Sequence, residues 1–214
     1  MHQEGQSQPL TTGNTLPGLA PFYDIVTTIL SLGRERQFRQ AVLDVADLEP
    51  GDSVLDVGCG TGTLALLARE QLGPRSTVHG IDATPQMIER ARRKARRQDR
   101  DVIFEMGVIE ALAYSGNTFD AVLSTLMMHH LPADVQARGI AEIRRVLKPG
   151  GRIVIADFSQ SEPSLTTLIH GPEPGSEDRK DTFTKLVEDA GFRHVRIGPL
   201  PMRGIFYVTG VKPA

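Results

Sequence analysis

The chain has 214 residues, of which 40% are hydrophobic and 23% are charged, and its formal net charge at pH 7 is -2. This is the composition of an ordinary globular domain with its own core, and the near-neutral charge provides no general attraction for nucleic acid or for an anionic membrane. The single cysteine, Cys59, excludes an internal disulfide and a thiolate metal cluster, and the lack of a signal-peptide pattern or of an apolar run of about 18 residues predicts a cytoplasmic protein without a membrane-spanning segment.

The region before the first predicted strand has two parts. Residues 1–18 are polar and rich in Gly, Pro, Thr and Gln, so we expect a flexible tail there and a single domain over 19–214. Within 19–50, apolar residues recur at helical spacing on both sides of Gly33 and predict two amphipathic helices. These apolar positions are Phe22, Ile25, Val26, Ile29 and Leu30, followed by Phe38, Ala41, Val42, Val45 and Ala46.

The segment VLDVGCGTGTLAL, residues 54–66, predicts a strand, a glycine loop and a helix in immediate succession. Gly58, Gly60 and Gly62 tolerate positive φ and carry no Cβ, so a ligand can lie against the loop backbone beside the start of the helix. Their GxGxG spacing differs from the GxGxxG dinucleotide fingerprint and from the GK[ST] ending of a phosphate-binding loop. Asp56, two residues before the first glycine, would repel a phosphate but suits a ligand that carries an ammonium group.

The next segment, STVHGID over 76–82, predicts a second strand that ends in an acid, Asp82. This acid lies about 20 residues beyond the glycine loop, the spacing at which a carboxylate accepts hydrogen bonds from ribose hydroxyls in doubly wound sheets. Thr84 is the expected N-cap of the following helix and Pro85 its first residue. The buried stripe of that helix consists of Met87, Ile88, Ala91 and Ala95.

The helix that follows Thr84 is strongly basic outside its apolar stripe. Its cations are Arg90, Arg92, Arg93, Lys94, Arg96 and Arg97, with Arg100 just beyond. A patch for nucleic acid or acidic lipid and an ordinary solvated helix face both account for this pattern, and cations near the end of a helix also suit its dipole. Because no aromatic residues lie between the cations, we favour the solvated face and expect no nucleic-acid partner.

Two histidines follow the fourth predicted strand. The third strand is expected over 102–105 and the fourth over 120–124, which leads into STLMMHHLPADV. Residues just past such a strand lie at the carboxyl edge of the sheet, where open α/β folds place their ligands. His129 is a candidate substrate-facing base and His130 a structural residue, because adjacent side chains do not reach one site unless the backbone turns between them.

The rest of the chain completes an α/β pattern. It contains a helix capped by Asp134 and ended by Pro149, Gly150 and Gly151, a fifth strand over 152–158, a Gly/Pro/Ser-rich loop over 159–177, a helix over 182–190, and strands over 193–198 and 204–211. Strand and helix alternate up to the fifth strand, and the last connection is short. We therefore predict a doubly wound, seven-stranded, mostly parallel sheet with an antiparallel C-terminal strand and helices on both faces. Residues 51–158 would form the ligand-binding core, and 159–214 a substrate-side loop and a C-terminal hairpin.

Four segments resemble a known family. VLDVGCGTGTLAL resembles motif I of the class I S-adenosylmethionine (SAM) dependent methyltransferases, and RRVLKPGGRIVIADFS resembles their motif III. FYDIVTTILSLGRERQFR, residues 22–39, and GFRHVRIGPLPMRGIFYVTGVKP near the end resemble the ubiquinone and menaquinone C-methyltransferases. The resemblance implies a Rossmann-like fold with SAM as cofactor, S-adenosylhomocysteine as product, no metal, and N-terminal helices over 19–50 that close over the site.

The resemblance also implies roles for individual residues. Asp56, Gly58 and Gly60 would hold the methionine end, Asp82 the ribose, and Ala83 and Met87 the adenosine. The cofactor site would be completed by Cys59, Gly62, Val108, Ile109, Glu110, Ser124 and Thr125. Tyr23 would be a lid residue and, with His129, a catalytic candidate. At Val108 and Ile109 the family pattern F-x-x-G-D-A-E has Asp and Ala, so adenine would be held here by backbone and apolar contacts.

A sulfonium methyl is already activated, so the enzyme has to align a nucleophile with the methyl–sulfur bond, exclude water and remove a proton where needed. We expect direct in-line displacement to a small-molecule acceptor that is quinone-like, phenolic or a natural-product intermediate. The alternatives are N-methylation of an amine or phospholipid head group, and a SAM-binding fold that does not methylate. A nicotinamide-dependent oxidoreductase is disfavoured by the GxGxG spacing and by Asp56, and an arsenic substrate by the single cysteine.

Two further expectations concern metal and assembly. His2, His79, His170 and His194 are scattered and lack Cys or carboxylate neighbours at metal-site spacing, so we expect no metal. The segment between the fifth strand and the last helix is much shorter than in the quinone methyltransferases. This predicts an open site that the N-terminal helices, or a second subunit of a homodimer, would complete.

Overall fold

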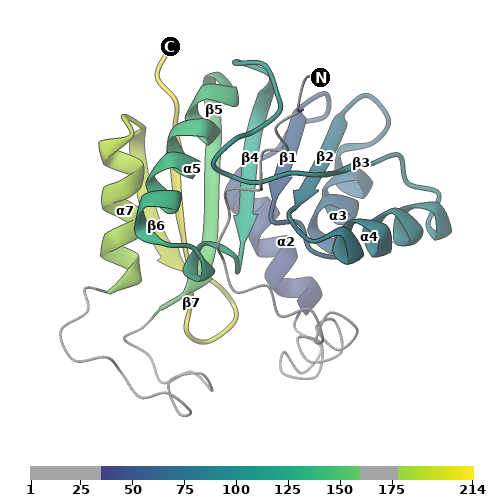
Figure 1. Cartoon of the computed structure of the whole chain (residues 1–214), viewed down its shortest axis with the longest axis horizontal. Helices are drawn as coiled ribbons and strands as arrows, with labels where there is room; N and C mark the ends of the chain where they lie inside the picture. Colours follow the sequence, from purple (N-terminus) through teal and green to yellow (C-terminus); the bar gives the residue numbers. More distant parts are fainter. Residues whose placement is uncertain (1–34, 160–177) are drawn as a thin grey trace, which may run out of the picture.

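A computed structural model describes residues 35–159 and 178–214 of the chain (Figure 1). The predicted tail over 1–18, the first predicted N-terminal helix, the lid candidate Tyr23 and the loop over 160–177 lie outside the described residues. The second N-terminal helix and all seven predicted strands lie within them.

The described residues form one seven-stranded sheet in the order β3-β2-β1-β4-β5-β7-β6. Strands β1 to β5 pair in parallel, and β7 pairs antiparallel with both β5 and β6. The strands are β1 (Ser53–Val57), β2 (Thr77–Asp82), β3 (Ile103–Met106), β4 (Phe119–Thr125), β5 (Leu147–Phe158), β6 (Arg193–Pro199) and β7 (Ile205–Val211). The predicted α/β fold with a mostly parallel sheet and an antiparallel C-terminal strand is confirmed.

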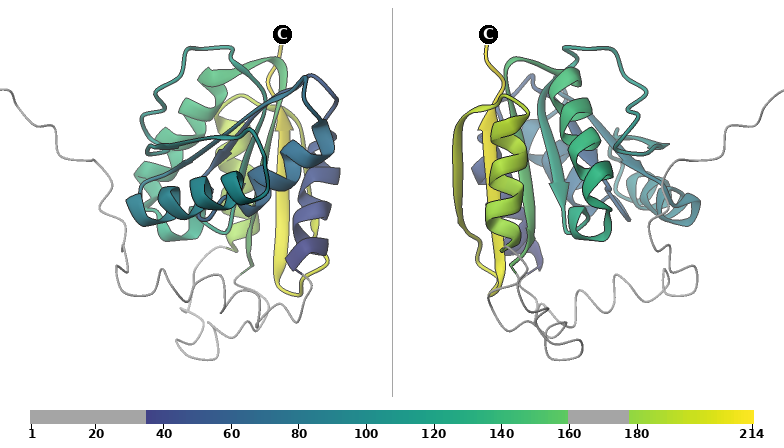
Figure 2. Two further views of the ribbon diagram at one scale, coloured as in Figure 1. Left: turned by 90° about the vertical axis from the view of Figure 1, so that its right-hand side faces the viewer. Right: turned by 60° about the vertical axis from the view of Figure 1, so that its left-hand side comes forward.

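Helices cover both faces of this sheet, and Figure 2 shows α2 and α5 on opposite sides of it. One face carries α2 (Glu35–Ala46), α3 (Thr63–Leu72) and α4 (Pro85–Arg97), and the other carries α5 (Ala133–Val146) and α7 (Arg179–Asp189). Alternate strand residues point to opposite faces, so Val154 of β5 joins one hydrophobic cluster while Ile153 and Ile155 join the other. None of the helices in the described ranges combines the length and the apolar character needed to cross a bilayer.

One predicted helix cap is wrong, and a second is present without a side-chain hydrogen bond. Helix α5 has Pro132 at its N-cap position, so Asp134 lies inside the first turn and accepts a hydrogen bond from Arg138 (Nη1 to Oδ2, 2.8 Å). Thr84 occupies the N-cap position of α4, as predicted, but its side chain makes no capping hydrogen bond. Its backbone N–H instead donates to Asp82 Oδ1 at 2.8 Å, which links the end of β2 to the start of α4.

Strand β5 and helix α7 begin earlier than predicted. Strand β5 starts at Leu147 rather than at residue 152, because Leu147 pairs with Phe119 ahead of a register shift in the ladder between β4 and β5. Helix α7 starts at Arg179 rather than at residue 182, because Asp178 is its N-cap and accepts a hydrogen bond from the N–H of Lys180 at 3.3 Å. The carboxyl end of β5 is the predicted one, so the residues at that edge of the sheet are unchanged.

The carboxyl ends of β1, β2, β4 and β5 lie along one edge of the sheet because these neighbouring strands run in the same direction (Figure 1). Asp56, Asp82 and Ser124 lie at or next to these strand ends. Topological switch points of this kind are where open α/β sheets bind ligands. In this sheet the order reverses between β1 and β4, directly beside the glycine loop.

Candidate functional site

The glycine loop joins β1 to α3 and adopts the left-handed backbone that its glycines allow. Gly58, Gly60 and Gly62 have φ values of 72°, 53° and 77°. The N–H groups of Gly58 and Cys59 both donate to the carbonyl oxygen of Ile81 at 2.9 Å, which ties the loop to the end of β2. A Cβ at Gly60 would meet no atom within 4 Å, so this part of the loop borders open space where a ligand can reach the backbone.

Gly60 and Gly62 predict two different responses to alanine. A Cβ at Gly62 would collide with Phe104 and Ala91, whereas one at Gly60 meets nothing. We expect Gly62→Ala to lower the free energy of unfolding by about 3 kcal/mol, through overpacking added to left-handed strain, and Gly60→Ala by about 1 kcal/mol, through strain alone. Urea unfolding measures both. Gly150→Ala, which also has positive φ and open space, is the matched control, and equal losses at Gly60 and Gly62 would contradict the packing argument.

Asp56 is a carboxylate buried beside the glycine loop. Its side chain is 1% exposed, and neither of its oxygens has a hydrogen-bond partner among the described residues. Burial raises its pKa to about 7, and the positive charge of Arg39 offsets part of that effect. A buried, unpaired carboxylate is costly, whereas the same group facing a ligand ammonium is stabilised. The residue therefore fits the role predicted for it toward a cationic ligand.

Asp82 organises the backbone around the loop. Its Oδ2 accepts the N–H of Gly60 at 2.9 Å and its Oδ1 accepts the N–H of Thr84 at 2.8 Å. One carboxylate therefore connects the end of β2, the glycine loop and the start of α4. Each carboxylate oxygen has a second lone pair, so Asp82 can still accept hydrogen bonds from a ribose.

The residues predicted to surround adenosine differ in their availability. Ala83 is exposed and Met87 and Val108 are half-buried, so all three are open to a ligand. Ile109 is not, because its side chain is buried in the hydrophobic core, where it occupies the space beside Gly139 of α5. The backbone of Ile109 is then the part of this residue left for cofactor contact, and its place in the site stays a prediction.

Two more buried polar side chains lie near this edge. Glu110 is 8% exposed and neither carboxylate oxygen is hydrogen bonded among the described residues, and the same holds for Oγ of Ser124. Thr125, the last residue of β4, is half-buried. Buried polar groups are normally hydrogen bonded, so these orphaned atoms, like those of Asp56, fit a site completed by a polar ligand.

The chain turns sharply after β4. Leu126 has φ of 53°, a left-handed conformation that is uncommon for leucine, and its N–H donates to the carbonyl oxygen of Ala156 at 2.8 Å. A short 3₁₀ turn, η1 (Met128–His130), follows and brings the rings of His129 and His130 to a centroid distance of 3.8 Å. The backbone turn needed to bring both histidines to one place is therefore present.

Asp157, which the sequence analysis did not single out, lies directly beside His129. It is fully buried near the end of β5, and its Oδ1 is 2.6 Å from Nδ1 of His129 while its Oδ2 accepts the backbone N–H of His129 at 3.1 Å. A signal was available, because Asp56, Asp82 and Asp157 all lie at or next to the end of an apolar strand. What the sequence did not reveal was that strands four and five are neighbours with this register.

Cys59 is a buried thiol in the glycine loop. Burial raises the pKa of the Cys59 thiol, and the nearby charges of Asp56 and Asp82 raise it further, so the reactive thiolate is suppressed. Over residues 35–159 and 178–214, no group of three or more His, Cys, Asp or Glu side chains could hold a metal ion.

Comparison with known families matches residues 48–191, more than half of the chain, to a family described as methyltransferase domain. The chain belongs to this methyltransferase family. The matched span includes the glycine loop, Asp82, His129 and Asp157, so every part of the site described above lies within it.

Two curated relatives place this methyltransferase more closely. The ubiquinone/menaquinone biosynthesis C-methyltransferase UbiE of Geobacter sp. strain M21 is 35% identical over 155 residues, which are 71% of this chain and 65% of the relative. The arsenite methyltransferase of Halobacterium salinarum is 33% identical over 165 residues, which are 72% of this chain and 40% of the relative. The chain thus spans less than two thirds of the length of each of these proteins. The predicted resemblance to the quinone methyltransferases is confirmed.

A solved structure of a SAM-dependent methyltransferase from Aquifex aeolicus has the same fold. It superposes with a TM-score of 0.70 at 24% sequence identity, covering 88% of this chain and 97% of that one. At this level of identity the likeness concerns the fold.

Some cations of the basic helix α4 of the methyltransferase hydrogen bond within the protein, so they do not belong to a solvated face alone. Arg92 donates from Nε and Nη2 to the carbonyl oxygen of Phe104 at 2.9 and 2.6 Å, and so covers a backbone acceptor of β3, an edge strand of the sheet. Lys94 donates from Nζ to the hydroxyls of Thr61 and Thr63 at 3.0 and 2.8 Å. Two of the predicted surface cations therefore have structural roles, one of them at the glycine loop.

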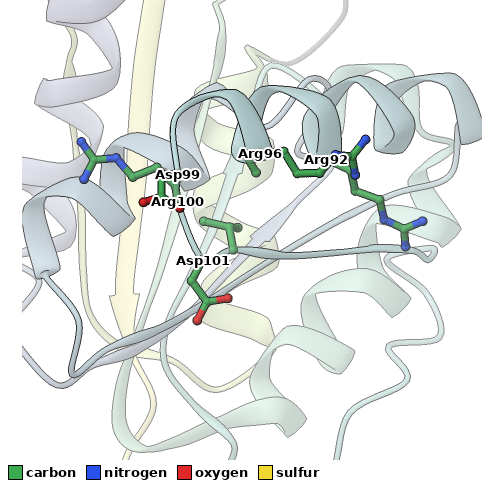
Figure 3. Close-up of a pocket in the computed structure, with 7 residues that line it drawn as sticks. Arg92, Arg96, Asp99, Arg100 and Asp101 are labelled. Atoms are coloured by element: carbon green, nitrogen blue, oxygen red, sulfur yellow. The ribbon is translucent and has the colours of Figure 1, made fainter.

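A pocket of about 390 Å³ lies beneath the C-terminal half of α4 (Figure 3). It is lined by Arg92, Ala95, Arg96, Asp99, Arg100, Asp101 and Val102. Since α4 begins beside Asp82 and runs away from it, this pocket is at the opposite end of the helix from Asp82. Its lining carries both signs of charge, which does not match a surface for a polyanion.

Proposed function

We propose that this protein transfers a methyl group from SAM to a small-molecule acceptor by direct in-line displacement, with S-adenosylhomocysteine as the second product. The observation that carries the proposal is Asp56, a buried carboxylate at the end of β1, next to a glycine loop that borders open space. Its oxygens have no hydrogen-bond partner within residues 35–159 and 178–214. A ligand with an ammonium group relieves the cost of burying that charge, whereas the phosphates of a dinucleotide increase it.

The residues at this edge of the sheet match successive parts of the SAM molecule. Asp56 would receive the ammonium group, the backbone at Gly60 would allow close approach, and Asp82 would accept from the ribose hydroxyls with its free lone pairs. Met87 and Val108 would flank the adenine. When bound, SAM supplies a methyl group already activated on a sulfonium, so the chain has to align the acceptor and exclude water.

A quinone-like or phenolic acceptor is the proposed substrate class. The Geobacter relative is named for ubiquinone and menaquinone biosynthesis, and the sequence resemblance at both ends of the chain points the same way. An arsenic substrate, as in the name of the arsenite methyltransferase, is not proposed for this chain. The single cysteine of this chain, Cys59, is buried with a raised pKa and provides no set of thiolates. His129 is the proposed base, and Tyr23, outside the described residues, stays a lid proposal.

Calorimetric titration of the full-length protein with SAM, and separately with NAD, tests the cofactor. We expect micromolar affinity for SAM and no binding of NAD. Gly60→Ala should weaken SAM binding at least tenfold, because its Cβ enters the open space beside the loop, while Gly150→Ala, a glycine of similar φ away from the site, should not. Absence of SAM binding by the wild-type protein, or binding of NAD in its place, would overturn the proposal.

A further inference from the structure

The position of His129 is set by the pairing of β4 with β5. Thr125 at the end of β4 is in register with Ala156 of β5, so the residue after Ala156 lies beside the exit of β4. The left-handed turn at Leu126 then folds the chain back, and His129 lies against Asp157 although the two are 28 positions apart. A leucine held in this conformation is a strained feature of the kind that clusters at functional sites.

Asp157 is arranged only to accept hydrogen bonds. Its Oδ1 accepts the backbone N–H of Phe158 at 2.7 Å and faces Nδ1 of His129 at 2.6 Å, and its Oδ2 accepts the backbone N–H of His129 at 3.1 Å. Because an ionised carboxylate can only accept, a hydrogen bond from His129 to ionised Asp157 requires the hydrogen on Nδ1. In a neutral imidazole the other nitrogen, Nε2, then carries the lone pair.

The imidazole ring of His129 is held from several sides. Besides Asp157, it stacks at a tilt on His130 (centroid distance 3.8 Å) and meets Phe158 edge to face at 5.4 Å. The His129 side chain is 16% exposed, and no described residue hydrogen bonds to its Nε2. The ring is therefore fixed in orientation while Nε2 remains available to a bound molecule.

We propose that Asp157 is a positioning residue that holds His129 as a neutral base with Nε2 directed at the acceptor, and that the acceptor accordingly carries an ionisable hydroxyl, as a phenol, hydroquinone or enol does. This inference rests on the proposed methyl transfer. A fully buried carboxylate that fixes the tautomer and stabilises the imidazolium is the arrangement that makes histidine an effective general base.

The step balances without any further reactant. The hydroxyl proton passes to Nε2, and the oxygen, or a ring carbon conjugated with it, forms a bond to the methyl carbon. When the carbon attacks, its own proton then passes to water and the oxygen regains a proton, so the net release is still one proton. The carbon–sulfur bond of the sulfonium breaks with its electron pair on sulfur, so S-adenosylhomocysteine leaves as a neutral thioether. Asp157 stabilises the imidazolium until its proton passes to water. A neutral amine attacks with its own lone pair and loses its proton afterwards, so it does not need this base.

The tautomer of His129 tests the positioning role independently of the acceptor. In full-length protein labelled with ¹⁵N at histidine, long-range proton–nitrogen spectra should show a protonated Nδ1 and an unprotonated Nε2 for His129, with the resonance assigned from His129→Gln. Asp157→Asn, which preserves side-chain shape, should change that pattern, because an amide can both donate to and accept from Nδ1. A wild-type His129 protonated on Nε2 alone would overturn the proposal.

Methyl transfer to matched acceptors tests the catalytic consequence. The probes are catechol and 4-nitrocatechol, which differ little in shape but strongly in the acidity of the hydroxyl, and phosphoethanolamine as an amine. With catechol, Asp157→Asn and His129→Gln should each lower kcat by about 100-fold or more, while the KM for SAM stays unchanged. With 4-nitrocatechol the loss should be much smaller, because its hydroxyl is already ionised at neutral pH.

The pH profile of kcat, measured with control variants at His130 and His194, tests whether His129 is the base. The titratable groups that face the His129 ring are Asp157 from β5 and His130 from η1, and the charge of Arg179 on α7 acts on His130. The acidic limb of the kcat profile with catechol should disappear in His129→Gln and persist in His194→Asn, an exposed histidine on β6. Equal losses on both catechols in Asp157→Asn, a loss carried by His130→Gln instead, or methylation of phosphoethanolamine only, would overturn the proposal.

Titration with SAM tests the proposed cofactor separately from the role of Asp157. Wild-type affinity for SAM is expected in Asp157→Asn, His129→Gln, His130→Gln and His194→Asn, because none of these residues lies on the loop that would hold the cofactor. A wild-type protein that does not bind SAM overturns the proposed function. A wild-type protein that binds SAM but shows the other His129 tautomer overturns only the role of Asp157.

Discussion

Replacing Asp56 by asparagine should weaken SAM binding about 100-fold and at the same time make the unliganded protein more stable near pH 7. The first effect follows from losing a charge-assisted hydrogen bond between a buried carboxylate and the ligand ammonium, which is worth about 3 kcal/mol. The second follows because the carboxylate is 1% exposed and has no hydrogen-bond partner in the part of the chain that the structure describes. Opposite changes in affinity and stability at one residue are typical of a ligand-binding group.

The pH dependence of the stability effect has a definite sign. The pKa of Asp56 is raised from 3.8 to about 7 in the folded protein, by burial first. Between about pH 4 and pH 7 the unfolded chain has lost this proton while the folded chain retains it, so the free energy of unfolding falls as pH rises, by about 1.4 kcal/mol per pH unit. Asp56→Asn removes this slope, which extends over about three pH units, and should therefore be about 4 kcal/mol more stable than wild type at pH 7.

Denaturant unfolding at several pH values and calorimetric titration with SAM measure both effects. Asp189→Asn, at an exposed position of α7, is the control for the loss of one negative charge and should change neither quantity. Asp56→Asn with wild-type SAM affinity would remove Asp56 from the site. If the free energy of unfolding of Asp56→Asn still falls between about pH 4 and pH 7, a group other than Asp56 causes the slope.

Replacing Asp82 by alanine should lower SAM affinity by more than 100-fold and also destabilise the fold by about 2 kcal/mol. In the ligand-free protein the substitution leaves the N–H groups of Gly60 and Thr84 without their acceptor. In the complex it additionally removes the ribose acceptor. Affinity and stability therefore fall together at Asp82, in contrast to Asp56. Asp82→Asn keeps one acceptor oxygen and should give an intermediate loss of both quantities.

Fragments of the cofactor separate the two carboxylates. 5′-Methylthioadenosine contains the adenosine but lacks the amino-acid moiety of SAM. Asp82→Ala should weaken its binding as strongly as it weakens that of S-adenosylhomocysteine, whereas Asp56→Asn should leave its binding unchanged. Calorimetry with both ligands gives the comparison, and a loss of methylthioadenosine binding in Asp56→Asn would mean that this residue supports the loop rather than the ammonium group.

Much of the cofactor half of the site could be predicted from local sequence. Alternation of strand and helix patterns was enough for the seven strands, and the glycines with Asp56 and Asp82 followed from spacing along two consecutive strands. Helix α4 has the predicted start at Pro85. Thr84 is the predicted N-cap of α4, although Asp82 and not the Thr84 side chain makes the hydrogen bond there. The cap predicted at Asp134 is wrong, because Pro132 takes that position and N-cap preference is small.

The sequence by itself determined the fold class, the glycine loop and the acids beside it, because each depends on residues close together in the chain. Only the tertiary structure decided that His129 meets Asp157, that Ile109 faces the core and that Lys94 holds Thr61 and Thr63. The physical reason is common to all three: each contact joins elements that are adjacent only through strand order or helix packing. Hydrophobic periodicity shows that an element is buried, but not which neighbour it is buried against.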